Sequence, residues 1–154
     1  GPHSPDSIAD RILKVARTEQ ADTIVVMAGV NDLWTKPADS LRGTIASTDL
    51  LARGFGADVF FVTVPPLPIA SPLKRAEAER RRLNDSLLAD FPGRAIDCEA
   101  NLVDGAGHLR SEFAMASDDL HLNNAGEQAL ADCIAASPLL EGRLPGLRPV
   151  QTNR

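Results

Sequence analysis

The sequence contains no tyrosine, one tryptophan and five phenylalanines among its 154 residues. It also has no apolar stretch near the roughly 20 residues that a membrane-spanning helix needs. Positive charge is limited, because 16 lysine and arginine residues stand against 21 aspartate and glutamate residues, for a net charge of −5. This balance argues against a general nucleic-acid binder, which relies on a basic surface. The function must therefore be sought in individual polar residues of a globular domain.

Cysteine is also scarce, since Cys98 and Cys133 are the only two in the sequence. Two cysteines are too few for a disulfide framework, and these two lack the spacing of metal ligands. We therefore expect both side chains to be ordinary reduced thiols.

The length predicts one domain with a single core. Residues 1–4, Gly-Pro-His-Ser, resemble the remnant of a cleaved affinity tag and are left out of the fold prediction. The domain is expected to occupy residues 5–137. Glycine and proline recur through residues 138–154, which predicts a flexible tail.

Three short apolar runs have the length and composition of buried strands. They cover residues 21–27, residues 58–64 and residues 95–98. The first two are rich in β-branched residues or phenylalanine and are bounded by polar or glycine residues, as is typical of strands in a parallel sheet.

Helical periodicity fills the spaces between these runs. It predicts helices over residues 5–19, 37–54, 72–91 and 109–115, and a last helix that starts near residues 123–124. Ser4 is expected to cap the first helix. In the second helix, the residues expected to face inward are Leu41, Ile45, Leu50 and Leu51. In the third helix, a charged cluster is expected to form a solvated face, made of Glu77, Glu79, Arg80, Arg81 and Arg82.

The alternation of helices and strands predicts a three-layer α/β/α sandwich built on a parallel sheet. The run Ile24–Met27 is apolar enough to be a central strand, yet no earlier strand in the chain is available to pair with it. We therefore expect an unpaired apolar edge there. A second polypeptide, or a second copy of this chain, is the expected partner at that edge.

The segment from Asp118 to His121 is the first candidate for chemistry. A carboxylate three residues before a histidine can accept the imidazole Nδ1–H, which leaves Nε2 free to act as a base. The same residues also suit a helix start, in which Asn123 or Asn124 is the cap and the acidic residues lie near the positive end of the helix. A third interpretation makes Asp118, Asp119 and His121 metal ligands, but no further ligands stand at a recognisable spacing.

The loop after the first strand is the second candidate. In an open α/β sheet, chemistry takes place at the carboxyl ends of the strands. Gly29 would let the backbone turn sharply there, Asn31 would aim its amide at a developing oxyanion, and Asp32 would hold the loop through backbone amides. Alternatively, Asn31 is only a turn former.

Taken together, Gly29-x-Asn31-Asp32 after a buried strand and Asp118-x-x-His121 before an amphipathic helix resemble the SGNH, or GDSL-type, serine hydrolase family. The resemblance spans roughly residues 5–136. It implies a flavodoxin-like fold whose first two strands do not lie in this chain. It also implies an esterase that needs no metal or organic cofactor.

The resemblance assigns roles to individual residues. His121 would be the general base, Asp118 its orienting carboxylate and Asn31 an oxyanion donor, with Gly29 and Asp32 shaping the loop. The family's nucleophilic serine and a glycine block have no counterpart here. Ser7 lies in a sequence that superficially resembles the nucleophile motif, but helix capping explains it.

Two hypotheses follow. In the first, the chain is part of an esterase whose nucleophile-bearing segment is supplied by another chain or fragment, and it acts on an acyl ester such as a short-chain ester or an O-acetylated sugar. In the second, it is a non-catalytic module that keeps the hydrolase scaffold for binding or assembly.

Overall fold

The computed structural model describes residues 7–67, 74–117 and 121–143. Five α-helices and three strands account for most of them, in the order α1 Ile8–Thr18, β1 Thr23–Val26, α2 Ala38–Gly54, β2 Asp58–Val62, α3 Lys74–Asp90, β3 Ala95–Ile96, α4 Glu99–Leu102 and α5 Asn124–Ala135. Three 3₁₀ turns complete the described elements: η1 Asp32–Trp34, η3 Ser111–Phe113 and η4 Pro138–Leu140. No helix in these ranges is long and apolar enough to cross a membrane.

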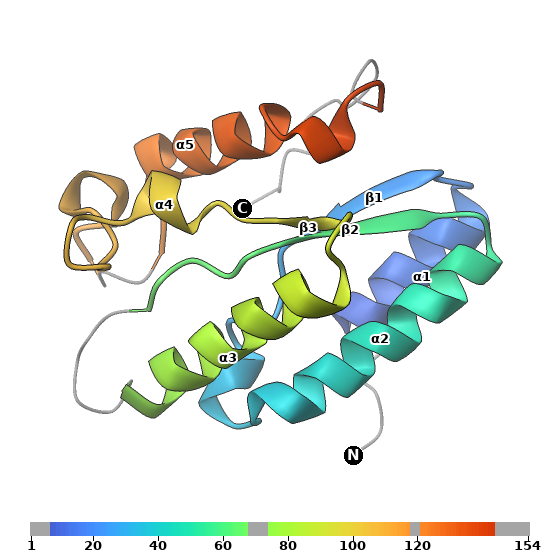
Figure 1. Ribbon diagram of the computed structural model, residues 1–154, viewed down its shortest axis with the longest axis horizontal. Helices are drawn as coiled ribbons and strands as arrows, with labels where there is room; N and C mark the ends of the chain where they lie inside the picture. Colours follow the sequence, from blue (N-terminus) through green and yellow to red (C-terminus); the bar gives the residue numbers. More distant parts are fainter. Residues whose placement is uncertain (1–6, 68–73, 118–120, 144–154) are drawn as a thin grey trace.

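The strands form one parallel sheet in the order β1-β2-β3. Thr23 pairs with Asp58 at the start of β1, and Phe61 of β2 pairs with both Val26 and Ala95. Helices α1, α2 and α3 cover one face, while α4 and α5 lie on the other (Figure 1). The predicted α/β/α sandwich is therefore confirmed. Within the described residues, β1 stands at the edge of the sheet, as expected.

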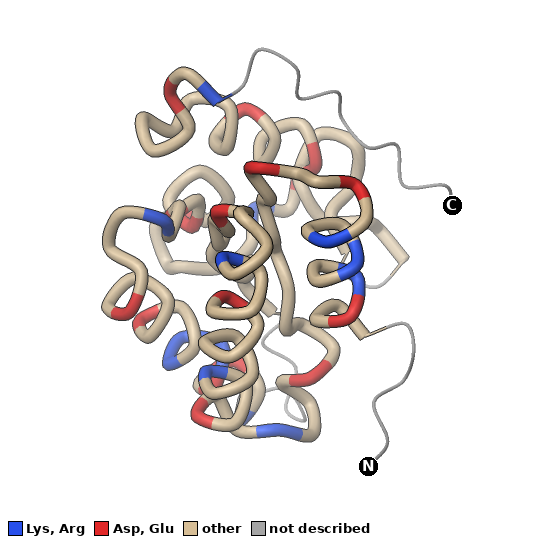
Figure 2. Tube along the Cα trace, turned by 90° about the vertical axis from the view of Figure 1, so that its right-hand side faces the viewer, with Lys and Arg blue, Asp and Glu red and all other residues tan. Residues whose placement is uncertain are grey.

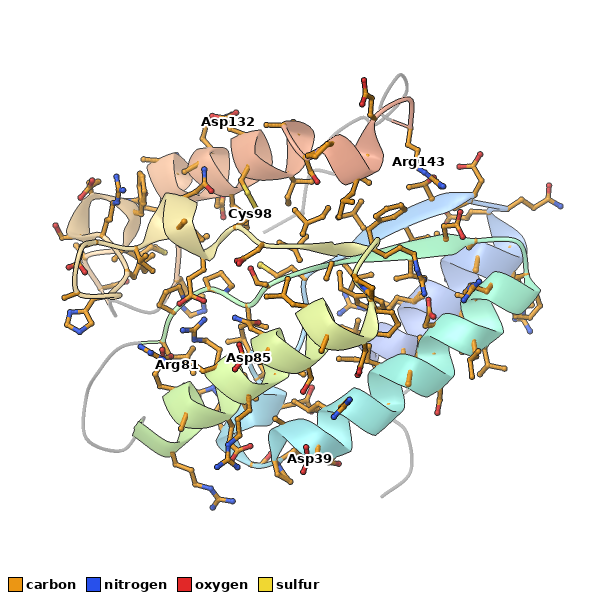
Figure 3. The ribbon with its side chains drawn as sticks, viewed as in Figure 1. Asp39, Arg81, Asp85, Cys98, Asp132 and Arg143 are labelled. Atoms are coloured by element: carbon orange, nitrogen blue, oxygen red, sulfur yellow. A yellow bond between two sulfur atoms is a disulfide. The ribbon has the colours of Figure 1, made fainter. Side chains whose placement is uncertain are left out.

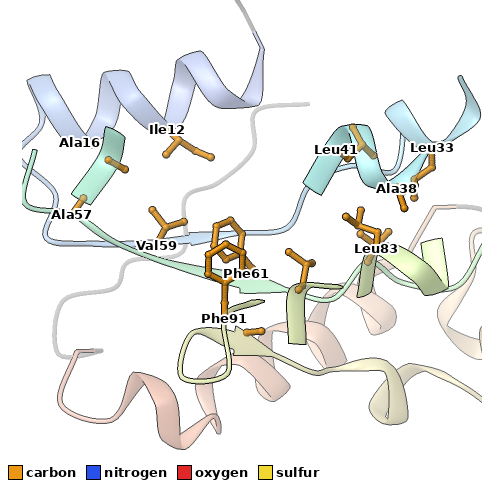
Figure 4. Close-up of a cluster of buried hydrophobic side chains, with 14 residues drawn as sticks. Ile12, Ala16, Leu33, Ala38, Leu41, Ala57, Val59, Phe61, Leu83 and Phe91 are labelled. Atoms are coloured by element: carbon orange, nitrogen blue, oxygen red, sulfur yellow. The ribbon is translucent and has the colours of Figure 1, made fainter. Parts of the chain in front are cut away.

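Alternation along β2 produces two cores, one on each face of the sheet. Val59 and Phe61 point toward α1, α2 and α3, where Phe61 packs against Phe91 with ring centroids 4.6 Å apart (Figure 4). Phe60 and Val62 point toward α5 and contribute to the second core. Because side chains alternate along a strand, the run Val-Phe-Phe-Val can be buried on both sides.

The boundaries of α1, α2, α3 and α5 agree with the sequence prediction to within a few residues. The helix expected over residues 109–115 is only the three-residue 3₁₀ turn η3, and α4 was not predicted. Two further corrections concern the cap of α1 and the buried face of α2. The first helix is capped by Ser7, whose Oγ accepts from the amide of Asp10 at 3.1 Å. Ser4, the expected cap, lies outside the described residues. In α2, Leu41 is buried, but Leu50 and Leu51 are 69% and 55% exposed.

The inward face of α2 explains the second correction. It is formed by residues four, three and four positions apart, namely Leu41, Ile45, Thr48 and Ala52. This stripe follows the 3.6-residue period of a helix. Leu50 and Leu51 fall outside it, so the polar Thr48 is buried in their place.

The last part of the described chain differs from the expected flexible tail. Leu140 is fully buried in the second core. Arg143 pairs with Asp58 at 3.0 Å, donates to Thr23 Oγ1 and stacks over the ring of Phe60 (Figure 3). Residues 138–143 therefore belong to the domain, and residues 144–154 lie outside the described ranges.

The prediction of two free thiols is wrong, because Cys98 and Cys133 form a disulfide with a Cα–Cα distance of 5.9 Å. Cys98 follows β3 and is fully buried, and α5 carries Cys133 across the same face of the sheet (Figure 3). Their sequence separation of 35 hides this proximity in the sequence. The bond ties α5 directly to the carboxyl end of β3.

Removing this bond is expected to destabilise the domain. Replacing both cysteines with serine should lower the free energy of unfolding by about 2 to 4 kcal/mol, because the unfolded chain regains the entropy of an open loop. Urea unfolding, followed by the fluorescence of Trp34, measures the difference. Adding a reductant should destabilise the native protein and leave the double serine variant unchanged. Equal stability of the oxidised protein and the variant would contradict a structural role for the bond.

Candidate active site

The loop after β1 is a tight turn built on Gly29. This glycine has φ +111°, a conformation that side chains rarely adopt, and an added Cβ would lie 3.1 Å from Leu83 Cδ2. Its carbonyl accepts from the amides of Asp32 and Leu33 at 3.1 and 3.0 Å. The turn leaves Asn31 exposed, immediately before η1. Gly29 thus makes the sharp turn that was expected of it after the first strand.

Asp32 acts differently from the expectation. Its carboxylate accepts from Lys36 Nζ at 2.7 Å, rather than binding the backbone amides of the loop. The carbonyl of Asp32 accepts from the amides of Thr35 and Lys36, and these bonds close η1. The pair is about half exposed, so it contributes little to stability. Its opposite charges leave no net charge beside the loop.

His121 lies in an exposed segment directly before α5. Its carbonyl accepts from the amide of Met115 at 2.8 Å. Two residues later, Asn123 caps α5 by accepting from the amide of Gly126 at 2.9 Å. The side-chain amide of Asn123 also donates to the carbonyls of Glu112 and Ala114. Asn123 is therefore the N-terminal cap of α5, and His121 stands two residues before this cap.

Gly126 explains how closely this segment is packed. A Cβ at this position would lie 2.5 Å from the carbonyl oxygen of Phe113, closer than side chains come to backbone. Only glycine lets α5 approach the strand-like segment around Ala114 and Leu122, which form a bridge. The geometry around His121 thus depends on Asn123 and Gly126.

The two predicted segments reach the same end of the molecule. The strands point toward the end at which α5 begins, so the loop after β1 and the segment before α5 lie at the carboxyl edge of the sheet (Figure 1). Asp118, the expected partner of His121, lies outside the described residues, as does Asp119. Ser7 is engaged in the cap of α1, where its hydroxyl donates to Asp10 Oδ2.

Arg80 and Glu77 of α3 and Glu99 of α4 form a buried ion cluster against the segment that follows β2. The sequence did not predict it, and the expectation of a fully solvated face on α3 is wrong at Arg80. Arg80 is fully buried. It binds Glu77 through Nε and Nη2 at 2.7 and 2.6 Å, and it reaches Glu99 at 3.2 Å. Arg82, two residues along, is 74% exposed in its side chain, as expected for the cluster.

This cluster holds the backbone that follows β2. Arg80 Nη1 donates to the carbonyl of Val64 at 2.8 Å, and Glu77 accepts from the amide of Leu67 at 3.0 Å. Asn84, also buried, donates to the carbonyl of Val64 and accepts from its amide. The segment 64–67 is therefore fixed at the same edge of the sheet as the loop after β1.

Burial acts against the charge of Glu77, because desolvation favours the neutral carboxyl. Hydrogen bonds from Arg80 and from the amide of Leu67 outweigh it and hold the pKa of Glu77 below its ordinary value. For Arg80, burial likewise opposes the charge, and the carboxylates of Glu77 and Glu99 overcome it, so the pKa of Arg80 is raised. Both groups are therefore ionised at neutral pH.

Charges of both signs are interspersed along the helices (Figure 2). In residues 7–67, 74–117 and 121–143, no group of three or more histidine, cysteine, aspartate or glutamate side chains could hold a metal ion.

Solved structures share this fold at low sequence identity. A GDSL-like lipase from Bacteroides thetaiotaomicron is 21% identical with a TM-score of 0.69, over 84% of this chain and 69% of that one. A protein assigned as an acylhydrolase from Bacteroides fragilis is 19% identical with a TM-score of 0.69. The match covers 84% of this chain and 68% of that one. The OSK domain of Drosophila Oskar is 19% identical with a TM-score of 0.66, over 73% of this chain and 59% of that one. At these identities the likeness shows the fold alone.

No curated protein matches the sequence. A sequence model of the GDSL-like lipase/acylhydrolase family matches residues 4–129, which is most of the chain and includes both segments described above. The chain therefore belongs to the GDSL-like lipase/acylhydrolase family.

Proposed function

We propose that this chain takes part in the hydrolysis of an acyl ester, for which it supplies the base and one oxyanion donor. The nucleophilic serine comes from a segment outside these 154 residues, on another chain or fragment. Membership of an acylhydrolase family supports the reaction class. The observation that supports the proposal is that the loop after β1 and the segment before α5, which carry Asn31 and His121, lie at the carboxyl edge of the sheet (Figure 1).

Each residue has one kind of role in the proposed reaction. The serine oxygen attacks the acyl carbon, and His121 Nε2 takes the hydroxyl proton while Asp118 orients the imidazole. The side-chain amide of Asn31 donates to the oxyanion that forms. His121 then returns the proton to the departing alcohol, and water repeats the sequence to release the carboxylic acid.

The open edge of β1 is the proposed contact for the missing segment. The residues of β1 are only partly buried, although all but Thr23 are aliphatic. A strand added beside β1 would bury them and satisfy the unpaired backbone groups of the edge. Because the carboxyl ends of parallel strands meet at one edge, a parallel strand would bring its own carboxyl end beside Asn31. The partner at this edge is thus the polypeptide segment that carries the serine, because a second copy of these 154 residues would not supply it.

Asn31 offers a specific test in the assembled hydrolase, meaning this chain with the polypeptide that carries the serine. Replacing Asn31 with alanine should lower kcat about 10²- to 10³-fold with little change in KM, because the lost hydrogen bond forms mainly in the transition state. Asn101→Ala is the control, since Asn101 is exposed on α4. Hydrolysis of p-nitrophenyl esters measures both. Equal kcat values for the two variants would remove Asn31 from the mechanism and favour a turn-forming role.

A further inference from the structure

A cavity of about 200 Å³ lies between α1, α2 and the helical face of the sheet. Its walls are mainly apolar, and the residues that define them are Ile8, Ile12, Leu41, Ile45, Phe61 and Leu87. Ile12, Leu41 and Phe61 belong to the core around this face of the sheet (Figure 4). The cavity therefore interrupts the core where α1 and α2 diverge.

One end of the cavity is polar and reaches the candidate active site. Gly29, Asp32 and Lys36 line it there. The side chains of Asp32 and Lys36 are 43% and 53% exposed, so this end opens to solvent. Asn31, the proposed oxyanion donor, lies in the same loop as Gly29 and Asp32, although it does not itself line the cavity.

The other end lies deeper along α2. From Leu41 to Thr48 the lining descends seven residues of helix, or about 10 Å at the usual rise. Thr48 is buried, and its hydroxyl is already satisfied by the carbonyl of Thr44 at 2.8 Å. The deep end therefore offers no free hydrogen-bond donor beside its aliphatic walls, which favours an apolar ligand over water there.

The size fits a short alkyl chain. An apolar cavity of about 150 Å³ takes one benzene molecule, so a cavity of 200 Å³ takes about six to eight carbon atoms. Apolar walls with a polar opening suit a molecule with an apolar tail and a polar head. The opposite charges of Lys36 and Asp32 cancel at the opening, which favours a neutral head group over a free carboxylate.

We propose that this cavity binds the acyl chain of the substrate, a chain of about six to eight carbon atoms, with the ester carbonyl at the opening beside Asn31. This selects medium-chain esters over acetyl esters. The statement that the bound alkyl chain belongs to a substrate rests on the proposed function. The affinity of the cavity for an alkyl chain is independent of that function, because binding needs neither the serine nor catalysis.

The test uses 1-alkanols from butanol to decanol, which carry a neutral head and no hydrolysable bond. Titrations are followed by the methyl NMR signals of Ile12, Ile45 and Leu87. Affinity should rise about fourfold per added methylene while the chain fills the cavity, and should level off at about eight carbons. Binding to exposed apolar surface would instead keep rising with length and would leave these methyl groups unperturbed.

Two variants place the binding in this cavity. Ala9 lines it on α1, so Ala9→Phe should fill it and lower the affinity for 1-hexanol at least tenfold. Ala46→Phe is the matched control, because Ala46 is exposed on α2. Should Ala9→Phe fail to fold, Thr48→Leu fills the deep end instead and should shorten the longest chain that still gains affinity.

The outcomes separate this proposal from the proposed function. Saturable alkanol binding that Ala9→Phe removes supports the cavity as an alkyl site, whether or not the assembled protein hydrolyses esters. In an active assembly, Ala9→Phe should lower kcat/KM for octanoyl esters and spare acetyl esters. Absence of saturable binding, or binding that Ala9→Phe leaves intact, would overturn the proposal even if acetyl esters are hydrolysed.

Discussion

Replacing His121 with alanine should lower the kcat/KM of the assembled hydrolase about 10²- to 10⁴-fold, which is the usual contribution of a general base. His121 is exposed in front of α5, and Asn123 and Gly126 hold the backbone around it. The fold should therefore survive the change. Initial rates with p-nitrophenyl esters give the loss, and circular dichroism checks the fold.

His108 provides the matched control for this experiment. It is also an exposed loop histidine, and its loop is held by the carboxylate of Asp104, which accepts from the amides of His108 and Ala106. These backbone bonds remain in His108→Ala, so its activity should equal that of the native protein. Equal losses in the two variants, or full activity in His121→Ala, would show that His121 is not the base.

Replacing Arg80 with methionine should lower the free energy of unfolding by about 3 to 5 kcal/mol, the usual cost of breaking a buried ion pair. The change leaves Glu77 without its main partner and removes a donor from the carbonyl of Val64. Arg82→Met is the control, since Arg82 is exposed and reaches Glu79 only at 3.5 Å. Urea unfolding of the control should change by less than about 0.5 kcal/mol. Similar values for the two variants would contradict the buried role of Arg80.

The same comparison predicts a pH dependence. The pKa of Glu77 is lowered in the folded protein, so its contribution to stability is present above its ordinary pKa, near 4.3, and is lost as the pH falls through the lowered value. In Arg80→Met, Glu77 is buried without the guanidinium, which raises its pKa. The stability difference between the native protein and Arg80→Met should therefore narrow as the pH falls from above the ordinary pKa of Glu77, where the variant's Glu77 begins to protonate, through the lowered value of the native protein. A constant difference across that range would contradict the assignment.

The sequence was sufficient to predict the sheet and the two candidate segments. Apolar runs specify where strands form, and Gly29 at a strand end indicates a turn whatever the rest of the fold does. The start of α5 was also predictable, because Asn123 and the apolar residues behind it are local signals. These features depend on neighbours within one or two turns of the chain.

Features that depend on distant contacts were not predictable. Arg80 and Arg82 are alike as residues, and only the packing of α3 against the segment after β2 buries the first and exposes the second. Cys98 and Cys133 meet because α5 returns across β3, which no local pattern encodes. The spacing Glu77-x-x-Arg80 was the one available signal for the ion cluster, and a solvated helix face shows the same spacing.

The central claim is that His121 and Asn31 serve a serine that lies outside these 154 residues. Fluorophosphonate labelling of the purified chain together with any polypeptide that accompanies it, followed by mass spectrometry of the adduct, tests this claim most directly. We expect an adduct on a serine of a second polypeptide or fragment, and loss of that adduct in His121→Ala. An adduct on a serine of this chain, such as Ser7, or an adduct that persists in His121→Ala, would contradict it.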